Sequence, residues 1–340
     1  MTRRGDDRRV LLFDKSSLEG LRTVVHDQIG QSFNVVVAPI LIHETQGAFV
    51  EGREADFLPM TPGERTQSIA RKIRPAGERV LRHWQGMCIA SLLGNEPSKN
   101  LEDQLQRGVE AIDGDGKRIV LTAHQSDGAT VTPQHYWLKS AAEGRWTSTY
   151  PRDGRTYESR FDELAGSILR NQHFRAAKPT TPGEVSGLTR LVLDDASSTL
   201  HLLDWLGDMV AGRRISTAQL RTEVRRRWRA QEKPHLKDFA PFAHHCALVK
   251  LLYLAGTEIW PGRRENNDFG DLEYLAYLPL TDVFVSDDKF VRAMAGQLMR
   301  ADQDLTCSCQ LRSHYTGATQ DSDKCMRAHG QPTAGFLLRA

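Results

Sequence analysis

The sequence lacks long apolar runs and an excess of charge of either sign. Its 340 residues include 45 Lys and Arg against 43 Asp and Glu, so the net charge of +2 selects no class of partner for the whole molecule. No uncharged apolar stretch reaches the roughly 18 residues that a membrane helix needs, and the segment MTRRGDDRRVLLF has neither the apolar stretch nor the cleavage site of a signal peptide. With 39% hydrophobic residues for a core, we expect a globular, cytoplasmic protein without a membrane partner.

Cysteine is scarce as well. The five cysteines are odd in number and unevenly spaced, which argues against the disulfide framework of a small secreted domain. The polar tail 301–340 holds Cys307, Cys309 and Cys325 together with His314 and His329. The pattern Cys-x-Cys followed by Cys-x3-His matches no structural zinc motif. Whether this tail binds zinc therefore stays open.

Charge is unevenly distributed along the chain, although it nearly balances overall. Eight basic residues from Arg213 to Lys233 face only two acids, whereas residues 265–288 are acidic. In the helix predicted at 216–230, apolar residues including Trp228 form one stripe and arginines project elsewhere. Such arginines beside an aromatic ring suit a nucleic-acid backbone, and a solvated face with Trp228 in the core explains the pattern equally well. The predicted nucleic-acid contacts are Arg221, Arg225, Arg226 and Arg229.

The N-terminal segment begins with a strand and a helix. Val10–Phe13 is a short apolar run, typical of a buried strand, and the following apolar residues keep helical spacing up to Ile29. Ser16 and Glu19 match a capping box, so we expect the helix to begin there.

A second strand and helix follow directly. Val35–Val37 is a β-branched run, and Pro39 is a common opening residue of a helix. Glu44 would then lie on the second turn. The order strand, helix, strand, helix predicts an α/β fold with a central parallel sheet.

The middle of the chain reads as an insertion, residues 51–195, which is mixed and mainly helical. We expect helices at 80–88 and, after a cap at Asn100, at 101–112; strands at 118–124 and 135–140; and a linker at 178–187. Further helices are predicted at 198–210, 216–230 and 239–255. The predicted organisation is 10–50 as the first half of the core, 51–195 as the insertion, 196–300 as a helical segment with the second half of the core, and 301–340 as the tail.

Acidic residues flank the predicted elements of the second half of the core. Asp271 begins a helix predicted to end at Leu278, and Asp287 and Asp288 follow a strand predicted at Asp282–Ser286; a helix at 289–299 comes next. Ligands of parallel α/β sheets bind at the carboxyl ends of the strands, where Asp14 also follows the first strand. Four carboxylates are therefore expected to converge: Asp14, Glu44, Asp271 and Asp288.

Clustered carboxylates raise one another's pKa, and a divalent cation removes that cost. Oxygen ligands favour Mg²⁺ or Mn²⁺. Such an ion activates a water molecule and stabilises the leaving oxygen of a phosphodiester. The chemistry indicated is metal-dependent phosphodiester hydrolysis.

The segments that carry these acids resemble the PIN domain, a nuclease fold. The resemblance lies in LLFDKSSL for its strand-Asp-x-Ser start, VVVAPILIHE for its second strand and helix, and DLEYLAYLPLTDVFVSDDKF for its Asp-headed helix and Ser-x-Asp strand end. It implies a three-layer sandwich and a Mg²⁺- or Mn²⁺-dependent nuclease, most often an endoribonuclease. By the same resemblance Asp14, Glu44, Asp271 and Asp288 hold the metal, with Ser16 and Ser286 hydrogen-bonding around them. Asp268 and Asp287 are near-duplicates of two of these acids.

The chain departs from the family in the long separation of Glu44 from Asp271. Insertions are tolerable because loop-closure entropy grows slowly with length. The first alternative to a nuclease is a PIN-like module that binds nucleic acid or a protein partner without cutting it. The second is a phosphatase or other metal hydrolase of small substrates. Homo-oligomer formation stays open.

Overall fold

The computed structural model describes residues 8–21, 23–41, 44, 72, 79–98, 100–105, 108–112, 118–122, 124–126, 129–131, 179–210, 217–256, 259–260 and 268–316. Their centre is a four-stranded sheet in the order β2-β1-β7-β8, in which every neighbouring pair is parallel. The strands are β1 (Val10–Phe13), β2 (Asn34–Val36), β7 (Val283–Val285) and β8 (Asp304–Thr306). The prediction of an α/β protein with a central parallel sheet is therefore confirmed.

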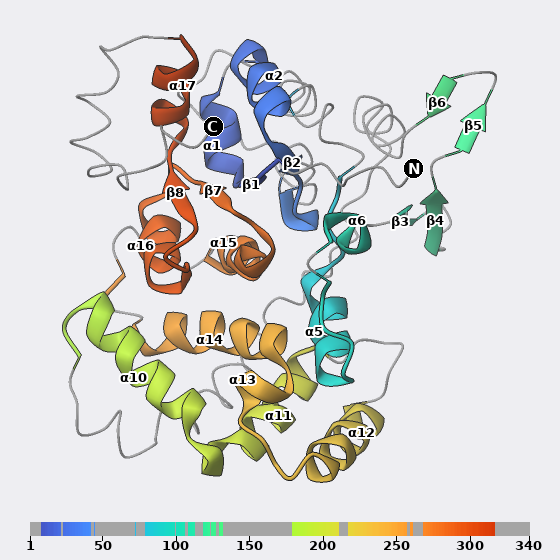
Figure 1. The fold of residues 1–340 in the computed structure, drawn as a ribbon, viewed down its shortest axis with the longest axis vertical. Helices are drawn as coiled ribbons and strands as arrows, with labels where there is room; N and C mark the ends of the chain where they lie inside the picture. Colours follow the sequence, from blue (N-terminus) through green and yellow to red (C-terminus); the bar gives the residue numbers. More distant parts are fainter. Residues whose placement is uncertain are drawn as a thin grey trace.

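Helices cover both faces of this sheet (Figure 1). On one face α17 (Ser308–Thr316) contacts α1 (Lys15–Gly20) and α2 (Thr23–Ser32); on the other, α15 (Asp268–Leu275) contacts α16 (Lys289–Leu298). The chain runs from β1 to β2 in one direction along the sheet and from β7 to β8 in the other. Right-handed crossovers in opposite directions place their helices on opposite faces.

A further layer of helices packs beneath α15 and α16 (Figure 1). It consists of α5 (Trp84–Leu92), α10 (Pro182–Asp194), α11 (Ala196–Val210), α12 (Thr217–Ala230), α13 (Leu236–Phe239) and α14 (Pro241–Ala255). We call these six helices the helical layer. Its central member, α14, contacts α5, α10, α13, α15 and α16, and one hydrophobic cluster runs from the sheet into this layer. None of the helices in the described ranges is long and apolar enough to cross a membrane.

Small antiparallel pairs occupy part of the predicted insertion. β3 (Gly108–Ile112) pairs with β4 (Arg118–Thr122), and β5 (His124–Ser126) with β6 (Ala129–Val131). The strand predicted at 118–124 is confirmed in β4, and the one at 135–140 lies outside the described residues. The helix predicted at 101–112 is wrong: after the Asn100 cap, α6 (Leu101–Gln104) makes a single turn and β3 follows.

Two boundaries on the way into the helical layer differ from the prediction. Val80 is extended and bridges Val37 at the edge of the sheet, so the helix predicted from 80 begins only at Trp84. The linker predicted at 178–187 is wrong from Pro182 onward, because Thr181 caps α10 in a capping box with Glu184. The helices predicted at 198–210, 216–230 and 239–255 are confirmed as α11, α12 and α14, the last opened by its own proline.

The second half of the core matches the predicted order with shifted ends. The helix predicted at 271–278 is α15, which spans Asp268–Leu275, followed by a 3₁₀ turn, η2 (Leu278–Leu280). The tail read as polar contributes the edge strand β8 and α17 to the core. At the N-terminus, the single helix predicted up to Ile29 is divided into α1 and α2 around Leu21, whose backbone is extended.

Candidate active site

The site lies where β1 and β7 end side by side. The chain leaves these neighbouring strands in opposite directions, towards β2 and β8, which is the arrangement that opens a ligand crevice in parallel sheets. Asp14 follows β1, and Ser286, Asp287 and Asp288 follow β7. The backbone N–H of Asp14 donates to the carbonyl of Val285 over 3.0 Å. The ends of these two strands are thus held together at the position where the acids begin.

Asp14 is buried, with 2% of its surface exposed, and it is the N-cap of α1. Its Oδ1 accepts from the Ser17 backbone N–H at 2.8 Å and from the Ser16 hydroxyl at 2.9 Å, and Oδ2 accepts from the Ser286 hydroxyl. Burial raises the pKa of Asp14 to about 6, against the lowering effect of the hydrogen bonds, of which Ser286 has the largest. The predicted capping box of Ser16 and Glu19 is wrong, since Asp14 caps the helix and Ser16 turns back to it.

The two serines join Asp14 to the loop after β7. Ser16 Oγ accepts from the backbone N–H of Asp287 at 3.2 Å, and Ser286 Oγ accepts from that of Asp288 at 3.1 Å. Each hydroxyl therefore accepts from the β7 loop and donates to the Asp14 carboxylate. These hydrogen bonds hold the Asp14 carboxylate in a fixed position relative to the loop.

The adjacent acids Asp287 and Asp288 cap two different helices. Asp288 Oδ1 accepts from the backbone N–H groups of Phe290 at 2.7 Å and Val291 at 3.0 Å at the start of α16. Asp287 uses both oxygens on Ser308 at the start of α17, Oδ1 accepting from its N–H at 2.8 Å and Oδ2 from its hydroxyl. Among the described contacts Asp288 commits only Oδ1 to its cap, so it is the better ligand of the two.

Glu44 and Asp271 reach the same edge around a residue that the sequence did not single out, Tyr274. The Tyr274 hydroxyl donates to Glu44 Oε2 at 2.7 Å. Burial raises the pKa of Glu44 to about 7; the hydrogen bond from Tyr274 and the charge of Lys15 lower it, and Asp14 raises it further. The pKa of Tyr274 lies well above its usual value because of burial and the charges of Glu44, Asp14 and Asp271. Glu44 is thus hydrogen-bonded to Tyr274, whereas Asp14 and Asp271 act on the tyrosine only through their charge.

Arg292 is a second residue that the sequence analysis missed. Its Nη1 donates to the carbonyls of Ser286 at 3.1 Å and Thr306 at 2.7 Å, at the ends of β7 and β8. Burial lowers the pKa of Arg292, whereas Cys307, Asp287 and Asp14 raise it. A guanidinium thus lies within the field of the acids. Arg292 follows Asp288 by one helical turn and Tyr274 follows Asp271 by nearly one, and this spacing is the signal that could have indicated both.

The donor set agrees with a hard divalent cation in its chemistry. Asp14, Glu44 and Asp271 offer carboxylate oxygens, the ligands that Mg²⁺ and Mn²⁺ prefer, and the raised pKa values of Asp14 and Glu44 show the charge cost that a cation offsets. In the described part of the chain, however, no three His, Cys, Asp or Glu side chains are gathered as a metal-binding group. The residues fit such an ion by type and location, without a closed coordination shell. Asp268 is the first residue of α15.

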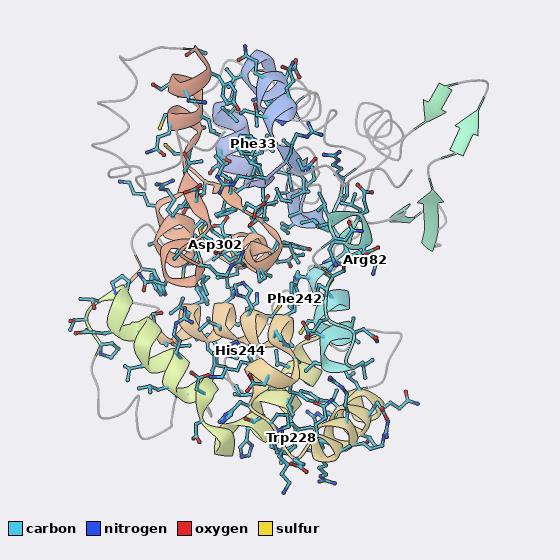
Figure 2. The ribbon with its side chains drawn as sticks, viewed as in Figure 1. Phe33, Arg82, Trp228, Phe242, His244 and Asp302 are labelled. Atoms are coloured by element: carbon cyan, nitrogen blue, oxygen red, sulfur yellow. The ribbon has the colours of Figure 1, made fainter. Side chains whose placement is uncertain are left out.

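The predicted nucleic-acid arginines lie on α12, at the end of the helical layer away from the sheet (Figure 1). Arg225 forms a two-pronged ion pair with Asp204, and Arg226 forms one with Glu223; Arg221 is half-buried and Arg229 exposed. Trp228, labelled at the bottom of Figure 2, is 7% exposed and its indole N–H donates to the Pro234 carbonyl at 2.8 Å. Trp228 is therefore a core residue, and stacking on a base is excluded for it.

The cysteines of the tail are described only in part. Cys307 is buried at the end of β8, with its Sγ 2.7 Å from Cys309 Sγ. The ring of His314 packs edge-on against Tyr315. Cys325 and His329 lie outside the described residues, so the question of a zinc site stays as the sequence leaves it.

Comparisons with family models, curated proteins and solved structures return no match to this chain. The resemblance to PIN domains therefore stays a prediction carried by the motifs.

Proposed function

We propose that this protein is a cytoplasmic, divalent-metal-dependent nuclease with a PIN-like three-layer core, which cleaves phosphodiester bonds within RNA. The observation that carries the proposal is the buried Asp14 carboxylate at the edge where β1 and β7 end, held by Ser16, Ser17 and Ser286, with the Glu44 carboxylate near enough for Asp14 to raise its pKa. Desolvation makes the ionised form of both acids unfavourable, as their raised pKa values indicate. Perturbed acids at a sheet edge of this kind are typical of functional sites.

Each residue has a distinct task in this proposal. Asp14, Glu44, Asp271 and Asp288 would hold Mg²⁺ or Mn²⁺, and the ion, when bound, supplies an activated water molecule and stabilises the leaving oxygen. Ser16 and Ser286 orient the Asp14 carboxylate by donating to it. Arg292 adds a fixed positive charge beside the acids, suited to a substrate phosphate.

The alternative is a PIN-like module that binds nucleic acid or a protein without cutting it. It is favoured by the caps of α16 and α17, because helix capping gives Asp287 and Asp288 a structural use. It is also favoured by the open arrangement of the acids in the described residues.

The test is cleavage of single-stranded RNA in Mn²⁺ by the wild type, Asp14→Asn and Asp282→Asn. Asp282 is the matched control, because it lies at the amino ends of β1 and β7, away from the site. Its Oδ2 accepts from the Val10 backbone N–H at 2.7 Å. We expect Asp14→Asn to lose about 100-fold or more of the activity and Asp282→Asn to keep it.

Three other outcomes decide against the proposal. If the wild type cleaves none of a panel of RNAs and DNAs, the proposal of a nuclease is rejected. If that protein still binds RNA in a filter-binding assay, the alternative of a non-catalytic binding module is supported. Turnover of small phosphate esters alone indicates a phosphatase. Equal loss of cleavage in Asp282→Asn indicates that general destabilisation, and not the site, explains the Asp14 variant.

A further inference from the structure

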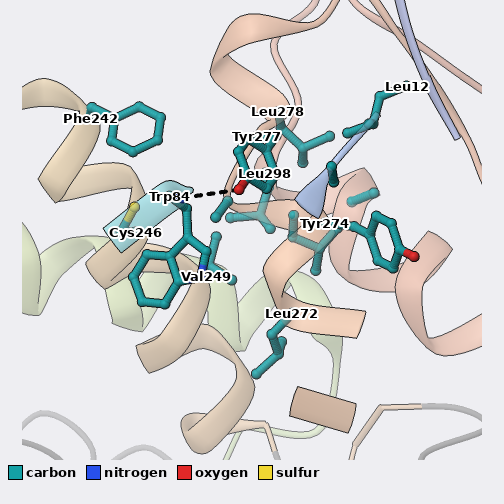
Figure 3. Packing of buried hydrophobic residues seen from close by; sticks show 14 of the residues in the cluster. Leu12, Trp84, Phe242, Cys246, Val249, Leu272, Tyr274, Tyr277, Leu278 and Leu298 are labelled. Carbon is teal, nitrogen blue, oxygen red and sulfur yellow. Dashed lines mark hydrogen bonds between the residues drawn. The ribbon is translucent and has the colours of Figure 1, made fainter. Parts of the chain in front are cut away.

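Two buried tyrosines, Tyr274 on α15 and Tyr277 in the turn just after it, point in opposite directions. Both side chains are fully covered, with 0% exposure for Tyr274 and Tyr277. The Tyr277 hydroxyl accepts from the backbone N–H of Trp84 at 2.9 Å, in the helical layer, whereas the Tyr274 hydroxyl donates to Glu44 at 2.7 Å. Figure 3 shows the two hydroxyls pointing in opposite directions, that of Tyr277 towards Trp84. One tyrosine thus serves the packing of α5, and the other reaches into the candidate active site.

A glycine on α15 leaves room for the same carboxylate. Gly270 precedes Tyr274 by four residues, so the two share one face of the helix. A Cβ at Gly270 would lie 2.8 Å from Glu44 Oε1 and 3.9 Å from Ile40 Cγ1. A glycine inside a helix is unfavourable, and this close approach explains it. Both oxygens of Glu44 therefore lie against α15. Oε2 accepts from the Tyr274 hydroxyl, and Oε1 occupies the space that the missing side chain of Gly270 leaves.

We propose that Tyr274 is a positioning residue that fixes the orientation of the Glu44 carboxylate, with Gly270 providing the room it needs. The hydrogen bond joins Tyr274 to a carboxylate 230 positions away in the sequence, so it holds Glu44 from a separate element. Asp271 is also on α15, and its charge contributes to the raised pKa of Tyr274. One helix therefore carries a predicted ligand and holds another in place. The proposed role towards the metal rests on the proposed function.

The competing explanation is that Tyr274 merely fills the core and donates to the nearest acceptor. Tyr274→Phe and Tyr277→Phe separate the two explanations, because each removes one fully buried, hydrogen-bonded hydroxyl and the two residues are only three positions apart. Gly270→Ala is a second route to the site, since it keeps the Tyr274 hydroxyl and favours the helix but places a methyl group against Glu44 Oε1.

The first measurement is the position of the Glu44 side chain in crystal structures of these variants. We expect Glu44 to leave the face of α15 in Tyr274→Phe and in Gly270→Ala and to stay in Tyr277→Phe. This readout needs no metal and no activity. An unmoved Glu44 in Tyr274→Phe overturns the proposal.

The second measurement is Mn²⁺ binding by the full chain, followed by calorimetry. Loss of a group that orients a ligand typically weakens metal binding by about 10- to 100-fold, so we expect this decrease in Tyr274→Phe and none in Tyr277→Phe. Raising Mn²⁺ should restore RNA cleavage by Tyr274→Phe but not by Asp14→Asn. A Tyr274→Phe protein that binds Mn²⁺ as the wild type does overturns the role towards the metal. A wild type that neither binds Mn²⁺ nor cleaves RNA rejects the proposed function instead, while a displaced Glu44 still supports the positioning by Tyr274.

Discussion

The sheet edge and the helical layer both bury ionisable groups, but of opposite kinds. At the edge, Asp14 and Glu44 are acids whose pKa burial raises, and the charge of Asp14 raises the pKa of Glu44 further. In the helical layer, His245 and Lys250 on α14 are bases whose pKa burial lowers. In both regions burial favours the neutral form. The two regions differ in the sign of the charge that is buried and in the contacts that these groups make.

The bases of the helical layer have ordinary structural surroundings. His245 Nε2 lies 2.9 Å from the Leu275 carbonyl, and the Lys250 ammonium lies 5.4 Å from the centre of the Trp84 ring. These contacts hold α14 against α15 and α5. At the sheet edge the Asp14 carboxylate is held by serine hydroxyls and a backbone N–H at the strand ends, and Glu44 by the Tyr274 hydroxyl. The comparison agrees with our proposal that the helical layer buries ionisable groups for packing, whereas the sheet edge holds them for chemistry.

The largest expected effect comes from removing a charge at the sheet edge. The pKa of Asp14 is 3.8 in the unfolded chain and about 6 in the folded protein, so the folded state binds more protons between these values and stability falls as pH rises through the window. We expect Asp14→Asn to stabilise the protein by about 1–3 kcal/mol above pH 6, and this gain to vanish towards about pH 4. Urea unfolding at about pH 4.5 and 8 measures it.

The control for this prediction is Asp282→Asn at the opposite edge of the sheet. Its carboxylate accepts from the Val10 N–H, so the substitution weakens a charge-assisted hydrogen bond, and we expect a loss of about 1 kcal/mol. If Asp14→Asn is also destabilising at about pH 8, its hydrogen bonds outweigh the cost of its burial, and the contrast between the two regions fails.

In the helical layer the sign of the pH dependence is reversed. The pKa of His245 is 6.5 in the unfolded chain and about 4 in the folded protein, mainly because of burial. The unfolded state then binds more protons between these values, so stability falls as pH drops below 6.5. His245→Gln keeps a donor for Leu275 and should be more stable than the wild type by about 2 kcal/mol at about pH 5, with less difference at about pH 7.5. His201→Gln, at an exposed site on α11, should leave the pH dependence unchanged; an unchanged profile in His245→Gln as well would contradict the prediction.

The fold was predictable from the sequence where the signal is local and strong. β1, β2 and β7 are runs of apolar residues between turn residues, and each was expected within a residue or two. β8 was missed because Asp304–Thr306 has a single apolar residue and forms the edge of the sheet. β3 was read as helix because its apolar spacing fits both periods, and pairing with β4 decides between them. A Pro-Gly pair hid α10, although its capping box was in the sequence.

The same distinction applies to the site. Asp14, Ser16 and Ser286 lie in short motifs at strand ends; the resemblance to the PIN motifs singled out the two serines, and both are hydrogen-bonded to Asp14. Tyr274 and Arg292 lie within helices, and their contacts with the site depend on which face of each helix packs against the sheet. The contact of Asp287 with the start of α17 depends on β8 and α17, which were not expected, whereas Asp288 caps α16, the helix that was predicted at 289–299. Tertiary contacts, not sequence spacing, carry that information.

The smallest expected effect concerns whether the helical layer contacts RNA at all. Arg226 and Arg229 are the exposed members of the predicted set on α12, far from the sheet edge (Figure 1). If they contact phosphates, replacing both with Ala should lower the slope of log K against log salt by about 1.4 for single-stranded RNA and leave cleavage at saturating RNA unchanged. Lys237→Ala, an exposed residue of the same layer that pairs with Asp194 at 3.6 Å, is the control and should not alter the slope. An unchanged slope in the double variant would assign the arginines of α12 to a solvated face and leave RNA binding to the sheet edge alone.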